Sequence, residues 1–188
     1  MTIQSIDLLA DLGQRTKHII QTVEEKFTSL STAQLNKKPS PEAWSIIECL
    51  EHLNRYGDYY LVEIKEKMQE SNKAPSSNFK SGVLGNYFAN MMLVKENKVK
   101  KMATFKNMNP AIIDTVIASN RCNTIMTKFL NQQKEMLKLL EEAQKKHLKA
   151  IKTPITIAPW LRLRLGDTFR FVIYHNERHV WQAERVLK

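Results

Sequence analysis

Two histidines in the C-terminal part of the chain have the spacing of a metal-binding pair. His175 and His179 lie four residues apart in a segment whose apolar pattern predicts a helix, so both rings project from one face. On a helical wheel that face also carries Phe171 and Val172, which places the imidazoles on the buried side. Two interpretations fit this position. The rings ligate one metal ion, or they are core histidines hydrogen-bonded to backbone or carboxylate groups.

A third histidine lies in the helix expected after Trp44. His52 is roughly 130° from the main apolar stripe of that helix on the wheel and shares its arc with Cys49, Tyr56 and Tyr59. Aromatic side chains with polar tips around a histidine suit the wall of a partly hydrated pocket; a half-exposed helix flank is the alternative. A free cysteine such as Cys49 is typically a small buried residue.

Apolar spacing of three and four residues predicts helices along most of the chain. They are expected from Ser5 to Leu30, from Ser45 to the loop at Ser71, from Ser81 to the break at Asn107, from Asn120 to His147, and from Asp167 to Leu187. Ser45 and Glu48 have the spacing of a capping box, and Asp167 is the expected N-cap of the last helix. The segment Ser31–Pro41 should break regular structure. The alternation in Thr153–Leu165 suggests a short extended segment with no evident partner strand.

Length and composition favour one helical domain over residues 1–188. Gly 5 and Pro 6 in 188 residues fall below the average usage of about 7% and about 5%, which disfavours an all-β protein. A hydrophobic fraction of 43% excludes disorder. Cys49 and Cys122 cannot form a disulfide framework, so a reducing, cytoplasmic location is expected. The longest uncharged run, Ser81–Val94, is shorter than the about 20 residues of a membrane-spanning helix, so no membrane partner is expected.

The net charge of +10 is also compatible with a protein that binds an acidic partner such as a nucleic acid. The segment Lys95–Lys106 is rich in lysine, and basic patches attract phosphate backbones. A nucleic-acid-binding helical module is therefore an alternative function. A solvated helix end explains the same lysines, and no nucleic-acid-binding motif accompanies them, so a nucleic-acid partner is not the favoured reading.

Two motifs together resemble one known family. The segment Trp44–Leu53 resembles the Trp-Ser…Glu-x-Leu-x-His-Leu signature of the DinB/YfiT-like superfamily, and His175–Gln182 is similar to its closing His-x-x-x-His-x-x-Gln motif. The resemblance implies an all-α four-helix bundle of antiparallel helices, with a long crossover and one or two short extra helices or extended segments. It also implies a divalent metal ion, zinc or nickel, held by His52, His175 and His179.

The implied site has the character of a catalytic one. Three neutral imidazoles leave at least one coordination position open, and imidazole donors do not by themselves select the metal. The resemblance therefore implies a metal-dependent enzyme acting on a small-molecule substrate. Such an enzyme is a transferase that uses a low-molecular-weight thiol, or a hydrolase. A homodimer is expected by the same resemblance. A bundle that binds a metal or ligand without turnover is the further alternative.

Overall fold

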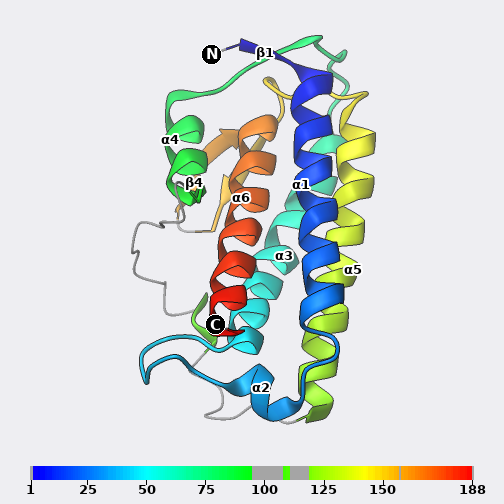
Figure 1. Ribbon diagram of the computed structural model, residues 1–188. Helices are drawn as coiled ribbons and strands as arrows, with labels where there is room; N and C mark the ends of the chain where they lie inside the picture. The colour runs from blue at the N-terminus through cyan, green and yellow to red at the C-terminus, as the bar shows by residue number, and fades with distance from the viewer. Residues whose placement is uncertain (1, 95–107, 111–118, 157, 188) are drawn as a thin grey trace.

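Four long helices make up most of the structure, a computed structural model that describes residues 2–94, 108–110, 119–156 and 158–187. They are α1 (Ser5–Lys26), α3 (Ile46–Gln69), α5 (Ser119–Ala143) and α6 (Leu165–Glu184). In Figure 1 they lie side by side, and α1 and α3 each contact both α5 and α6. Apolar side chains fill most of the space between them, and Leu12, Leu50 and Phe129 are fully buried. The expectation of a largely helical chain is confirmed.

Shorter elements connect and flank the long helices. They are the helices α2 (Thr32–Asn36) and α4 (Val83–Met92), the 3-10 helix η3 (Arg185–Leu187), and the strands β1 (Thr2–Gln4), β2 (Asn78–Lys80), β3 (Lys152–Ile155) and β4 (Ala158–Arg164). The strands form two antiparallel pairs, β1 with β2 and β3 with β4. In register, Ile3 faces Phe79 and Thr153 faces Leu163.

The capping box predicted at the start of α3 is confirmed. The Ser45 backbone N–H donates to Glu48 Oε2 at 2.8 Å, and the Glu48 N–H donates to Ser45 Oγ at 3.3 Å. Glu48 is buried and is also paired with Lys38 Nζ at 2.7 Å. These contacts satisfy helix N–H groups that otherwise have no partner. They fix where α3 begins, and so fix which face of α3 carries His52.

Two expectations for the loops are wrong. A short helix, α2, lies inside the predicted break Ser31–Pro41, because Ser31 and Gln34 form a second capping box. The predicted extended segment is confirmed as β4, but the expectation that it has no partner strand is wrong, since Lys152–Ile155 pairs with Ala158–Arg164. The sequence does not predict this hairpin because Pro154 lies within the first strand, and a proline usually indicates a loop.

The N-cap predicted for α6 is also wrong. The helix begins at Leu165 with Arg164 as N-cap, so Asp167 lies within its first turn. The buried Asp167 carboxylate accepts hydrogen bonds from the Gly82 N–H at 2.8 Å, from the Ser81 hydroxyl and from Arg170. A Cβ at Gly85 would lie 2.3 Å from Asp167 Oδ2, so only glycine permits this approach. Asp167 thus caps the N-terminus of α4 from a different helix.

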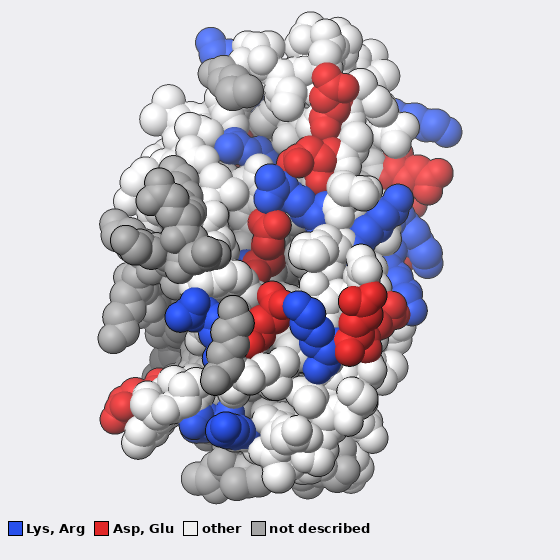
Figure 2. All heavy atoms as spheres, in the orientation of Figure 1, with Lys and Arg blue, Asp and Glu red and all other residues white. Residues whose placement is uncertain are grey.

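The excess positive charge does not dominate the face formed by α1 and α6. Figure 2 shows acidic and basic side chains interleaved there. Arg15 pairs with Asp11 and Glu177, both at 2.9 Å, and Lys26 pairs with Glu184. The basic segment Lys95–Lys106 lies outside the described residues. Among the described helices, none is long and apolar enough to cross a membrane.

Replacing Asp167 tests the link between α4 and α6. We expect Asp167→Ala to lower the free energy of unfolding by about 2–4 kcal/mol, because it removes the acceptor of the Gly82 N–H and the Ser81 hydroxyl and breaks the buried ion pair with Arg170. Denaturant unfolding followed by circular dichroism measures the loss. Asp11→Ala is the matched control, since its exposed ion pair should contribute below about 1 kcal/mol. Equal losses in the two variants would contradict this role.

Candidate metal centre

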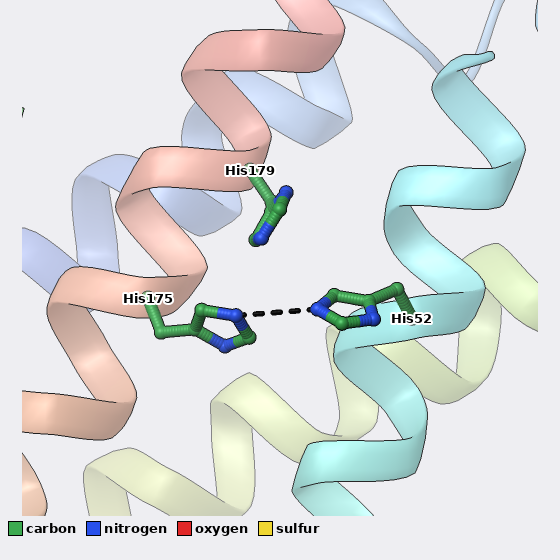
Figure 3. A group of neighbouring side chains, drawn as sticks. All are labelled: His52, His175 and His179. Carbon is green, nitrogen blue, oxygen red and sulfur yellow. Dashed lines mark hydrogen bonds between the residues drawn. The ribbon is translucent and has the colours of Figure 1, made fainter. Parts of the chain in front are cut away.

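Three histidines from two helices converge in the interior, as Figure 3 shows. His52 comes from α3, and His175 and His179 come from successive turns of α6. One nitrogen of each ring lies within 4.8 Å of the others. His52 Nε2 and His175 Nε2 are 3.2 Å apart. The three residues are buried, so the structure brings together the histidines that the sequence selected.

The outer nitrogens of two rings are held by fixed acceptors. His52 Nδ1 lies 2.7 Å from the Met108 carbonyl oxygen, which can only accept, so this nitrogen carries the proton. His179 Nδ1 lies 3.0 Å from Gln182 Oε1, an acceptor of the same kind. Both Nε2 atoms are therefore left with a free lone pair. This is the arrangement in which a neighbouring group orients a metal-binding imidazole.

The spacing of the inner nitrogens fits a metal ion. Two nitrogens bound to one zinc ion at about 2.0–2.1 Å in tetrahedral geometry lie about 3.3 Å apart, close to the 3.2 Å between His52 and His175. In the part of the chain that the structure describes, His175 Nδ1 is buried without a hydrogen-bond partner. The alternative of core histidines held by backbone or carboxylate groups accounts for His52 Nδ1. The inner nitrogens of His52 and His175 are also within hydrogen-bond distance of each other, and no carboxylate joins the three rings among the described residues.

Burial keeps the three imidazoles neutral. It lowers the pKa of His52 to about 4, with a further contribution from Arg55 and against the effect of the Met108 carbonyl. Burial also lowers the pKa of His175 and of His179 well below the usual value, and His52 and Arg178 act in the same direction on both. The hydrogen bond with Gln182 opposes the effect at His179. Only the neutral form offers a lone pair to a metal. The cluster is thus in its metal-binding form at neutral pH.

Aromatic rings form the walls of the cluster. The Trp44 ring centroid lies 4.7 Å from that of His52 and 5.5 Å from that of His179. Tyr56 lies 4.4 Å from His175, and Phe171 stacks parallel to His175 at 6.0 Å. Tyr56, which the sequence placed on the same arc as His52, contacts it with ring centroids 4.9 Å apart, whereas Tyr59 packs against Tyr60. The alternative of a half-exposed helix flank is wrong, because His52 is only 2% exposed.

Two further residues contribute to this site. Trp44, the first residue of the motif Trp44–Leu53, touches two of the histidines, a contact that the sequence did not predict. The Met108 carbonyl could not be found, because a backbone oxygen has no sequence signal. Gln182 did have a sequence signal, because it is the last residue of the motif His175–Gln182. The other two histidines lie outside the cluster: His18 is exposed on α1, and His147 Nδ1 accepts from the Ala150 N–H beyond α5.

The comparisons with known proteins agree with the motifs. A family model described as DinB superfamily matches residues 15–183, a range that contains all three histidines and the four long helices except the first residues of α1 and the last of α6. The comparisons with curated proteins and with solved structures found no significant match.

Cys49 lies one helical turn before His52 but belongs to the core. It is fully buried, and burial raises the pKa of its thiol, with a smaller contribution from the neighbouring Glu48. Because the thiolate is the reactive form, we expect Cys49 to resist iodoacetamide at neutral pH in the folded protein and to react once the chain is unfolded. Peptide mass mapping measures the modification. Rapid labelling of Cys49 in the native state would show that this thiol belongs to the accessible site.

Proposed function

The chain belongs to the DinB superfamily, and from this membership and its histidine cluster we propose that it is a metal-dependent enzyme. His52, His175 and His179 are the proposed ligands of one divalent ion. The observation that carries the proposal is the convergence of three buried, neutral imidazoles, two of them with their outer nitrogens already paired.

The donor set favours catalysis over a purely structural role. Among the described residues, no cysteine or carboxylate joins the three histidines, and a closed structural site uses four protein ligands. Imidazole donors suit zinc and nickel, which are the ions we propose. An ion at an open site of this type lowers the pKa of a water or thiol bound to it, and so supplies a nucleophile near neutral pH.

The protein's own side chains prepare the site for that chemistry. Met108 and Gln182 hold the rings of His52 and His179 in fixed orientations. Trp44, Tyr56 and Phe171 surround the imidazoles with apolar surface and limit the access of water. A small-molecule substrate suits such a site, and the thiol nucleophile of a transferase and the water of a hydrolase need the same open position. Of these two reactions we favour thiol-dependent transfer, because the aromatic walls limit the access of bulk water to the open position.

We further propose that the long helices form the antiparallel four-helix bundle of the family, as a single domain. The contacts of α1 and α3 with both α5 and α6 support this arrangement. In such a bundle the site is built from side chains on facing helices. A homodimer is proposed from the family alone. The nucleic-acid-binding alternative depends on Lys95–Lys106, which lies outside the described residues, and the interleaved charges of the α1–α6 face do not favour it.

Metal analysis tests the ligand set. We expect the purified protein to take up about one zinc or nickel ion per chain. We expect His52→Ala, His175→Ala and His179→Ala each to lose most of it, because two imidazoles bind far more weakly than three. His18→Ala and His147→Ala are the matched controls and should keep the ion. Elemental analysis after dialysis gives the stoichiometry. Wild-type protein that takes up no ion, or full uptake without two of the three histidines, would overturn the proposal.

Cobalt substitution distinguishes an open site from a closed one. We expect the cobalt-loaded protein to develop a sulfur-to-cobalt charge-transfer band when a small thiol is added, because an open coordination position admits the thiolate. Serine-like analogues that carry a hydroxyl in place of the thiol serve as the control. An absorption spectrum unaffected by thiols would exclude thiol-dependent transfer. A spectrum unaffected by thiols, azide and pH alike would favour a bundle that binds metal without turnover.

A further inference from the structure

Helix α4 presents apolar side chains to solvent. Val83 is 90% exposed, Leu84 50% and Tyr87 56%, and their spacing places them on one side of the helix. The opposite side, with Gly85 and Ala89, is buried against the protein. No residue of α4 carries a charge, and the polar residues exposed on this short helix are Asn86 and Asn90. That is unusual for a surface helix, which typically carries charged residues on its outer face.

A tryptophan on the neighbouring strand is also exposed to solvent. Strand β4 contacts α4, and the two lie beside each other in Figure 1, on the side of α6 away from α1. Trp160 of β4 is 84% exposed, where the pairing register between β3 and β4 shifts. Such irregularities redirect a side chain outward. We call Val83, Leu84, Tyr87 and Trp160 the apolar patch.

Basic residues predominate in the strands near α4, while Glu70, just after α3, lines a surface hollow together with Lys152. Helix α4 and strands β2, β3 and β4 together contain Lys80, Lys152, Arg162 and Arg164 and no aspartate or glutamate. Lys152 stands directly opposite Arg164 in the hairpin, and like charges facing each other destabilise a strand pair. Within the described part of the chain, no carboxylate pairs with Lys80, Lys152 or Arg162. An anionic partner would relieve this repulsion.

We propose that this surface attaches the protein peripherally to an anionic lipid bilayer. Exposed aliphatic side chains with tryptophan and tyrosine suit the boundary between head groups and acyl chains, and the bordering cations suit anionic head groups. A nucleic acid would satisfy the cations and leave Val83 and Leu84 in water. A second copy of the chain would bring the same cations face to face.

Peripheral attachment does not conflict with the helix lengths. The sequence disfavours a membrane partner because it lacks a spanning segment, and none of the described helices is long and apolar enough to span. A helix that lies in the plane of the membrane surface needs only one apolar face. Attachment therefore requires no segment beyond those described, and it does not depend on the histidine cluster.

Vesicle sedimentation tests the proposal. We expect wild-type protein to pellet with vesicles of equimolar phosphatidylcholine and phosphatidylglycerol at about 0.1 M salt. We expect it to pellet much less at about 0.5 M salt, where charges are screened, or with phosphatidylcholine alone. The Leu84→Ser/Tyr87→Ser variant and Trp160→Ser should each lower the partition coefficient about tenfold or more. Lys152→Gln and Arg162→Gln should each lower it about fivefold.

Matched controls and contrary outcomes make the test decisive. Val62→Ser on α3 and Lys138→Gln on α5 remove exposed residues of the same kinds elsewhere and should bind as wild type does. His175→Ala should also bind, which separates this proposal from the proposed metal function. Circular dichroism confirms that each variant is folded. Wild-type protein that stays in the supernatant, patch variants that bind as the controls do, or retention of single-stranded DNA in place of vesicles would overturn the proposal.

Discussion

The structure depends on the burial of three neutral imidazoles whose inner nitrogens face one another. Removing polar groups from water costs free energy unless they gain partners, and here His52 Nε2 and His175 Nε2 approach to 3.2 Å in the interior. This approach requires α3 and α6 to pack in one register, because a shift by one residue would turn a histidine away by about 100°. The capping box at Ser45 sets where α3 begins, and Asp167 ties the first turn of α6 to the start of α4.

The support around the imidazoles is drawn from distant parts of the chain. The Met108 carbonyl reaches His52 from a segment that follows α4 in sequence, and Gln182 reaches His179 from the next turn of α6. Trp44 closes the cluster from the loop before α3. The orientation of His52 on α3 therefore depends on contacts from outside that helix, whereas the orientation of His179 depends on Gln182 of its own helix. Arg55 and Arg178 are the cations that act on the imidazoles of this core. The cations on the strands near α4 bear instead on what the outer surface contacts.

The sequence predicted the parts of this arrangement that arise from local periodicity. Spacing of four residues placed His175 and His179 on one face, the wheel separated His52 from the apolar stripe, and Ser45 with Glu48 marked the start of α3. Long-range contacts had no such signal. Asp167 looked like an N-cap of its own helix, yet it accepts from Gly82. The β3–β4 pairing was hidden by Pro154, and Met108 contributes only a backbone oxygen. These contacts depend on how distant parts of the chain pack together, and the type of a single residue does not predict that packing.

Anomalous diffraction at the metal absorption edge tests the central claim most directly. Crystals of the protein grown with zinc or nickel should show one strong anomalous peak per chain, at about 2.0–2.1 Å from a nitrogen of each of His52, His175 and His179. Such a peak would show that the three imidazoles are the ligands of one ion. Metal-loaded crystals with no peak among these rings, or with a peak held by fewer than three of them, would contradict the account.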